Sequence, residues 1–186
     1  MKLTMRIAVA VVLGALCLPG LRAADENPLK NAKVGDWIEY AMRTEAMGQK
    51  MEMQMKQSVV AKDATAVTLR METTMMGQKM PGQDVKIPLD QPYEPSTQGL
   101  ADAKVTQLGE GNETISVGGK SYACHWTKTK VVATKPQAVE NTAKVWMCKD
   151  VPVNGLVRME SEGTMTMEGQ AMTTKMSMEL TGASGK

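Results

Sequence analysis

A short motif that recurs three times constrains the fold of this chain more than any other feature. Gly48-Gln49-Lys50-Met51, Gly77-Gln78-Lys79-Met80 and Gly169-Gln170-Ala171-Met172 are near copies, and apolar and polar residues alternate on either side of them. Such alternation is typical of a β-strand with one buried face. A Gly-X pair between two such strands is typical of a type II′ hairpin turn, with glycine in the first central position. The motif therefore predicts β-hairpins.

The first copy predicts a register in which four methionines of the hairpin share one face. With Gly48-Gln49 as the turn, Met42 faces Met55 and Glu45 faces Glu52. One face then carries Met42, Met51, Met53 and Met55, and the other is charged. The third copy places Met165, Met167, Met176 and Met178 on one face in the same way. The same register fails for the second copy, so Pro81-Gly82 is expected to insert a bulge or to end the pairing.

Further turns are expected at Lys62-Asp63-Ala64-Thr65, at Gly109-Glu110-Gly111-Asn112 and at Gly118-Gly119, with one long irregular connection over residues 88–103. No helical period is evident between Asp36 and Thr181. The prediction is a mostly β protein with a single antiparallel meander, forming a strongly curved sheet or half-barrel. A β-sandwich is the alternative.

The first 24 residues have the parts of an export signal. Lys2 and Arg6 supply positive charge, residues 7–18 are apolar, and small residues precede Asp25. The apolar run is shorter than the roughly 20 residues needed to span a bilayer, which argues against an uncleaved anchor. Leu16 before Cys17 argues against lipidation. We expect a single β domain over residues 25–186, in the periplasm or secreted, with no membrane span after cleavage.

The charge balance gives no indication of a nucleic-acid partner. The whole chain has 22 Lys and Arg against 20 Asp and Glu, and the signal removes three cations and no acid. The mature chain is therefore close to neutral. It has few aromatic residues for base stacking, since the whole chain holds three Trp, three Tyr and no Phe.

Two cysteines remain after cleavage, Cys124 and Cys148. In an oxidising compartment a disulfide between them is the expected state. If they face each other across antiparallel strands, Trp126 faces Trp146 and His125 faces Met147. Tyr122 would share the face of the cysteines and tryptophans, and the group would plug the core.

Methionine is unusually abundant, with 18 in the whole chain and no Phe. One interpretation is that Met42, Met51, Met53, Met55, Met165, Met167, Met176 and Met178 form an apolar face that binds a lipid or another apolar small molecule. The alternative is a Cu(I) site, because thioethers are soft ligands; its candidate ligands are Met51, Met53, Met55, His125 and Met147. Redox buffering through methionine sulfoxide is a third reading.

Nothing in the sequence indicates catalysis, and no cofactor is expected. His125 is the sole histidine, and no acid is expected beside it. A nucleophile, a base and an orienting group within hydrogen-bond reach are not evident. We therefore expect a protein that is not an enzyme.

Three stretches resemble uncharacterised bacterial secreted proteins: residues 34–40 (VGDWIEY), 117–124 (VGGKSYAC) and 145–157 (VWMCKDVPVNGLV). The last is similar to a strand-turn-strand of the lipoprotein-carrier (LolA/LppX-like) type. That resemblance implies an antiparallel sheet curled into a half-barrel around an apolar cavity. This chain departs from the type because it lacks helices to line or plug the barrel, and no binding residue can be transferred.

Overall fold

The computed structural model describes residues 27–46, 48–91, 102–134, 138–167 and 170–185. At residues 165–167 and 170–172 only the backbone is described. Most of the expected connection over 88–103 therefore lies outside the described residues.

The described chain begins with a short 3-10 helix and continues as ten strands. These are η1 (Pro28–Asn31), β1 (Trp37–Ala46), β2 (Gln49–Lys62), β3 (Ala66–Met75), β4 (Gln78–Lys79), β5 (Gln83–Pro88), β6 (Lys104–Val117), β7 (Lys120–Ala133), β8 (Val139–Met147), β9 (Leu156–Met167) and β10 (Gln170–Ala183). Within the described residues, no helix is long and apolar enough to cross a membrane.

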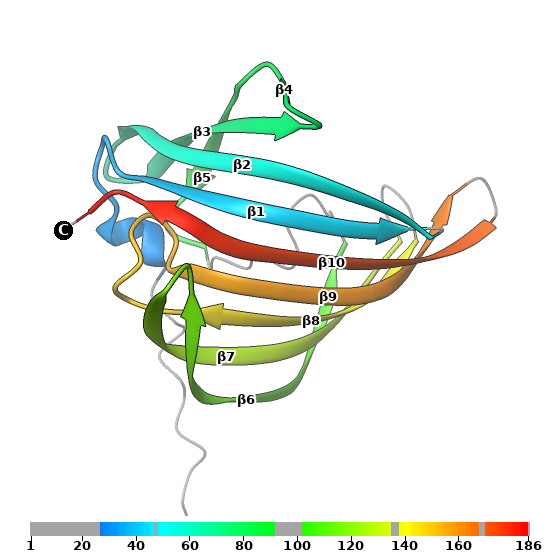
Figure 1. The fold of residues 1–186 in the computed structure, drawn as a ribbon. Helices are drawn as coiled ribbons and strands as arrows, with labels where there is room; N and C mark the ends of the chain where they lie inside the picture. Colours follow the sequence, from blue (N-terminus) through cyan, green and yellow to red (C-terminus); the bar gives the residue numbers. More distant parts are fainter. Residues whose placement is uncertain (1–26, 47, 92–101, 135–137, 168–169, 186) are drawn as a thin grey trace, which may run out of the picture.

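All ten strands belong to one antiparallel sheet, which is open at both edges (Figure 1). Its order is β4-β3-β2-β1-β10-β9-β8-β7-β6, and β5 pairs with β3 beside β4. The sheet is strongly twisted and curved, as expected of antiparallel strands of this length. The prediction of a curved antiparallel sheet is confirmed. The β-sandwich alternative is wrong, because a sandwich needs two sheets.

The first and last strands lie side by side at the centre of the sheet. Each half of the chain is a local meander, and the pairing of β1 with β10 joins the two halves. Local hairpin signals cannot predict this pairing, because its partners are far apart in the sequence.

The hairpin turns lie one residue earlier than predicted. Ala46 pairs with Gln49, and Met75 pairs with Gln78, so glycine takes the second position of each two-residue connection. Gly48 and Gly77 have φ of 76° and 79°, and Met76 before Gly77 has φ of 51°. Positive φ at both central positions is the type I′ turn, which matches the twist of the strands.

The earlier turn leaves each side chain of the first hairpin on its predicted face. It shifts the residue opposite each position by two, as from Met55 to Met53 opposite Met42, and residues two apart on a strand share a face. It does change which charges meet. Glu45 pairs with Lys50 rather than with Glu52, and Arg43 pairs with Glu52. Arg43 Nε lies 3.1 Å from Glu52 Oε1. The expected carboxylate pair is therefore wrong, and each carboxylate faces a cation instead.

The second motif is followed by the expected irregularity. Thr74 pairs with Lys79 before Pro81-Gly82, and Met71 pairs with Gln83 after it, which is a shift of one residue in register. The shift places Arg70 opposite Asp84, whose Oδ1 lies 2.8 Å from the arginine Nε. The predicted bulge is confirmed.

The expected turn at Gly109-Glu110-Gly111-Asn112 is wrong, because these residues lie within β6, which continues past a bulge between Gln107 and Gly109. These glycines give room to a neighbour. A Cβ on Gly111 would lie 3.0 Å from Trp126 Nε1, and one on Gly109 would lie 3.6 Å from the same indole. Both glycines therefore let Trp126 of β7 lie against the backbone of β6.

Part of the hydrophobic core lies where the connection between β8 and β9 packs against the first half of β1. Tyr40 is fully buried, and its Oη lies 2.9 Å from Asn154 Oδ1 and 3.0 Å from the Leu156 carbonyl oxygen. Asn154 Nδ2 donates to Gln57 Oε1 at 3.2 Å. This buried polar network ties β1 and β2 to the connection, and Leu29 of η1 is fully buried in the same core cluster.

The expected turn at residues 62–65 is confirmed by three hydrogen bonds. Asp63 Oδ1 accepts from Thr65 N at 2.7 Å, Thr65 Oγ1 at 2.7 Å and Ala66 N at 2.8 Å. These bonds lower the pKa of Asp63 to about 2, the hydroxyl of Thr65 contributing most. They favour the ionised carboxylate.

We expect the Asp63 carboxyl to titrate near pH 2 rather than near its unfolded value of about 4. Its stabilising contribution is therefore complete above pH 4 and disappears as the pH falls through about 2. A ¹³C-detected titration of the side-chain carboxyl measures this midpoint, and Thr65→Val should raise it. A midpoint near 4 in the folded protein would contradict the hydrogen-bond assignment.

Candidate ligand-binding surface

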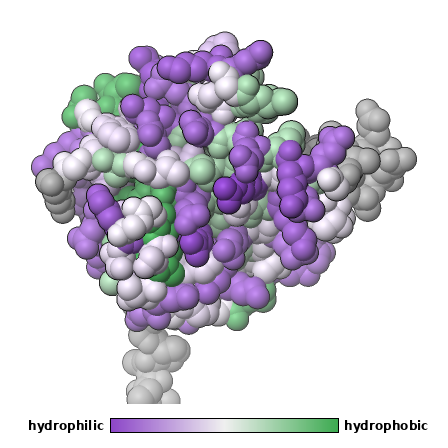
Figure 2. Space-filling view, viewed as in Figure 1, coloured by the Kyte–Doolittle hydropathy of each residue, from purple (hydrophilic) through white to green (hydrophobic). Residues whose placement is uncertain are grey.

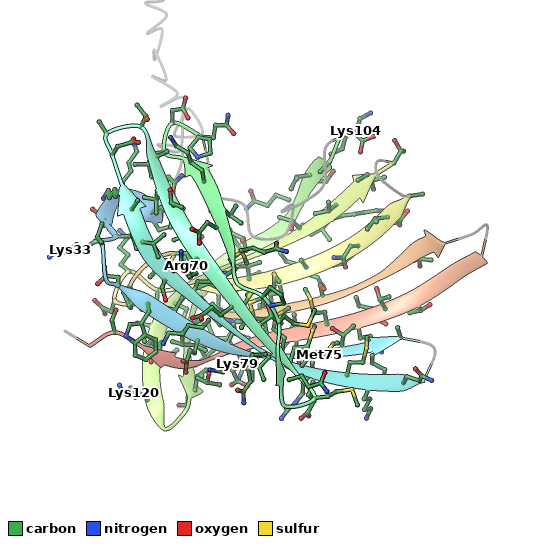
Figure 3. All side chains as sticks on the ribbon, turned by 90° about the horizontal axis from the view of Figure 1, so that it is seen from above. Lys33, Arg70, Met75, Lys79, Lys104 and Lys120 are labelled. Carbon is green, nitrogen blue, oxygen red and sulfur yellow. The ribbon has the colours of Figure 1, made fainter. Side chains whose placement is uncertain are left out.

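A row of methionines crosses one face of the sheet. Met42 of β1 pairs with Met53 of β2 on one side and with Met178 of β10 on the other. Met53 pairs in turn with Met75 of β3, and Met178 pairs with Met159 of β9. Directly opposed residues share a face, with Cβ atoms about 5 Å apart. These residues are called the methionine row below; sulfur atoms gather around the labelled Met75 in Figure 3.

Exposure changes along the methionine row. Met159 and Met178 are 4% and 7% exposed, whereas Met42, Met53 and Met75 are half-buried. The row therefore starts in the core and ends on accessible apolar surface. Flexible thioether side chains in such a position can repack around a bound apolar molecule.

The predicted apolar set is only partly brought together. Met42, Met53 and Met178 lie in the row. Met55 is buried opposite Tyr40, Met176 packs against the core, and Met51 is 45% exposed. The backbone of β9 and β10 pairs Met165 with Met172 and Met167 with Gln170, but the side chains of Met165 and Met167 lie outside the described residues.

Two members of the row were missed by sequence reasoning. Met75 and Met159 occupy the correct faces of alternating strands, but alternation alone does not say which strands are neighbours. Their membership follows from the pairings of β2 with β3 and of β9 with β10.

The candidate Cu(I) set falls into two groups. Met51, Met53 and Met55 lie on β2, whereas His125 of β7 pairs with Met147 of β8. Strands β1, β10 and β9 lie between β2 and β8, a separation of about 19 Å along the sheet. Met147 packs against the core beside its own strand neighbours.

His125 has an acidic neighbour that the sequence did not indicate. The pairing of β6 with β7 brings Glu110 Oε2 to 3.8 Å from His125 Nε2, and Asn112 Oδ1 to 3.3 Å from His125 Nδ1. Because β6 runs through the expected turn, its residues lie beside His125. All three side chains lie at the surface, and no nucleophilic group is placed beside the histidine among its described contacts.

Cys124 and Cys148 are both buried and are free thiols in the structure. His125 pairs with Met147 and Trp126 with Trp146, as predicted. These are the last pairs of the two strands on this side, and Cys124 and Cys148 are the next residues along the chain. Burial, and secondarily the nearby Cys148, raise the pKa of Cys124 to about 11. The disulfide itself stays a prediction.

The two tryptophans enclose a lysine next to these thiols. Lys144 Nζ lies 4.5 Å from the Trp126 ring centre and 4.3 Å from that of Trp146. Glu113 Oε2 accepts from Trp146 Nε1 at 3.0 Å and from Lys144 Nζ at 3.2 Å. These bonds hold the pKa of Glu113 below its usual range. In Figure 1 the end of β6 rises across this face, and it reaches β10.

A hollow of about 700 Å³ lies on the charged face of the sheet. Its lining includes Arg43, Glu45, Lys128, Lys144, Glu160 and Lys175. The face seen in Figure 2 is mainly hydrophilic. Charges of both signs alternate here and pair with each other, as Lys175 does with Glu162 at 3.2 Å. Such a surface does not favour a ligand of one charge.

Comparisons with known proteins leave the family open. No protein-family model matches the chain, and no curated protein matches it. One similar solved structure is that of a Bacteroides fragilis protein classed as exported and as having a YmcC-like fold. It has 10% identity and a TM-score of 0.48, and the match covers 83% of this chain and 97% of that one. A second is a DUF1329 family protein of Desulfovibrio piger, with 9% identity and a TM-score of 0.26, covering 84% of this chain and 92% of that one.

Proposed function

We propose that this chain is an exported, non-enzymatic binding protein whose methionine row holds an apolar small molecule such as a lipid. The observation that carries the proposal is the row itself. Five methionines lie in register across β3, β2, β1, β10 and β9, and part of the row is accessible. The export signal in residues 1–24 is the basis for an extracytoplasmic location.

A packed core does not require methionine. A packed core is served by leucine, isoleucine and valine, whose side chains have fewer rotamers to lose. A binding surface benefits from adaptable, polarizable side chains. Half-buried Met42, Met53 and Met75 therefore suit a surface that stays apolar when empty and changes shape when occupied.

The methionine row also offers a set of Cu(I) ligands that lie closer together than the candidates chosen from the sequence. Met53, Met42 and Met178 are neighbours on three adjacent strands, and thioethers are soft donors.

Native mass spectrometry of protein purified from its host's periplasm distinguishes the lipid carrier from the copper-binding protein. Lipid-sized adducts support the carrier proposal, and copper adducts support the metal reading.

A substitution in the row tests the carrier proposal directly. We expect Met53→Gln to weaken binding of the fluorescent apolar probe N-phenyl-1-naphthylamine by about tenfold. The bound probe would cover the new amide and leave it without a partner, which costs about 1–3 kcal/mol. Met53→Leu conserves volume and apolarity and should bind the probe within about twofold of the unsubstituted protein.

Met80 provides the control for this experiment. It is 49% exposed, lies outside the row, and follows the second hairpin. Met80→Gln should leave probe binding unchanged. Equal effects of Met53→Gln and Met80→Gln would contradict the proposed surface. Loss of tight Cu(I) binding in a well-folded Met53→Leu protein, with the probe still bound, would favour the copper alternative.

A further inference from the structure

Two buried polar atoms lie on the same face as the methionine row without a partner. Thr129 Oγ1 of β7 and Asn141 Oδ1 of β8 have no hydrogen-bond partner in the described part of the chain. Thr129 is 8% exposed. A buried polar atom without a partner is costly, and native proteins have few of them. This pair therefore needs an explanation beyond folding.

The strand register places these atoms next to each other and close to the row. Thr129 pairs with Ala143, and Asn141 pairs with Val131, so the two residues are diagonal neighbours on one face. Diagonal neighbours have Cα atoms about 7–8 Å apart, with side chains closer. Val145, the residue beyond Ala143 on this face, pairs with Met159 at the end of the row. Thr129 thus lies about 12 Å from Met159 along the sheet.

On β8 and β9 the neighbours of the pair are small and uncharged, whereas on β6 Gln107 pairs with Thr129 and Glu110 pairs with Thr127. Ala143 pairs with Ser161, and Asn141 pairs with Gly163. Along residues 127–133 of β7, 139–145 of β8 and 159–163 of β9, the side chains on the face of the methionine row are all uncharged. An ionised head group beside Thr129 and Asn141 would find no counter-charge on these three strands, and burying it would be unfavourable.

We propose that Thr129 and Asn141 form a polar subsite for the head group of a neutral amphiphile. This inference rests on the proposed function. The ligand class is an apolar chain that ends in a hydroxyl group, as in a long-chain alcohol. One hydroxyl serves both atoms. Its oxygen accepts from Thr129 Oγ1–H, and its hydrogen is donated to Asn141 Oδ1, which can only accept. The chain then extends over Met159 and Met178 toward Met42.

The test compares ligands that differ only in the head group. Dodecanol and dodecyl methyl ether are titrated against bound N-phenyl-1-naphthylamine, using the complete exported protein. The ether cannot donate to Asn141. We expect dodecanol to displace the probe at about tenfold lower concentration than the ether. Thr129→Val keeps the shape of the side chain and should reduce this preference to about twofold or less, while the probe itself still binds.

Thr142 supplies the matched control. It is a β8 threonine that lines the charged hollow, so Thr142→Val should keep the full preference for dodecanol. Asn141→Ala should remove the preference and gives a second test if Thr129→Val does not fold. Equal displacement of the probe by dodecanol and the ether in the unsubstituted protein would overturn the proposed subsite. It would mean that only water hydrogen-bonds to Thr129 Oγ1 and Asn141 Oδ1. Failure of the probe and both ligands to bind would overturn the carrier proposal as well.

Discussion

Gly163→Ala is expected to lower the free energy of unfolding by about 3 kcal/mol, which for a chain of this size lowers Tm by roughly 6–12 °C. A Cβ at this position would lie 2.3 Å from the Glu140 carbonyl oxygen and 2.7 Å from Asn141 Cα. Both atoms belong to the backbone of β8, so no side-chain rotation relieves the clash. Strands β8 and β9 must separate locally, and their ladder hydrogen bonds weaken.

Gly185 offers a control of the same chemistry. A Cβ there meets nothing within 4 Å, and Gly185→Ala should change Tm by no more than about 1 °C. Differential scanning calorimetry of both variants measures the difference. If Gly163→Ala melts as Gly185→Ala does, the close approach of β8 and β9 is wrong.

Reduction of the exported protein is expected to lower its free energy of unfolding by about 3 kcal/mol. The reason is that a Cys124–Cys148 disulfide would close a loop of 23 intervening residues and restrict the unfolded chain. Thiol counting under denaturing, non-reducing conditions should find no free thiol. Denaturant unfolding with and without dithiothreitol measures the stability difference.

Cys148→Ala makes the comparison specific, because this variant has no disulfide to lose and should not respond to dithiothreitol. Two free thiols in the exported protein would exclude the disulfide. The reduced protein should also lose stability as the pH rises from about 9 to about 11. Over that range the unfolded thiol ionises while the buried Cys124, with its raised pKa, stays protonated. The oxidised protein should show no such loss.

Parts of the candidate surface could be predicted because alternation has a period of two residues. The turn at Gly48 lies one position earlier than expected, which moves every partner by two and leaves each side chain on its predicted face. Met42 and Met53 therefore share a face in both registers. The same logic correctly paired Trp126 with Trp146 and His125 with Met147, because both pairings lie on neighbouring strands of one meander.

Other features could not be predicted because glycine has more than one use. Gly109 and Gly111 look like turn residues, yet they lie within β6, where the absent side chains leave room for Trp126. Continuation of β6 through this segment also brings Glu110 to His125. Whether a glycine forms a turn or leaves room within a strand depends on the size of the side chain opposite it on the neighbouring strand. The local sequence does not specify which side chain that is.

By itself, the sequence determined the predominance of β-strands, the faces of the first hairpin and the approximate places of most tight turns, because each depends on residues a few positions apart. Only the tertiary structure decided which faces meet. Met42 lies beside Met178 because β1 pairs with β10, across almost the whole described chain. That pairing depends on how the whole sheet buries its apolar face, since no local hydrogen bond or turn selects it. The methionine row, and the unpaired Thr129 and Asn141 beside it, exist only once the sheet is assembled.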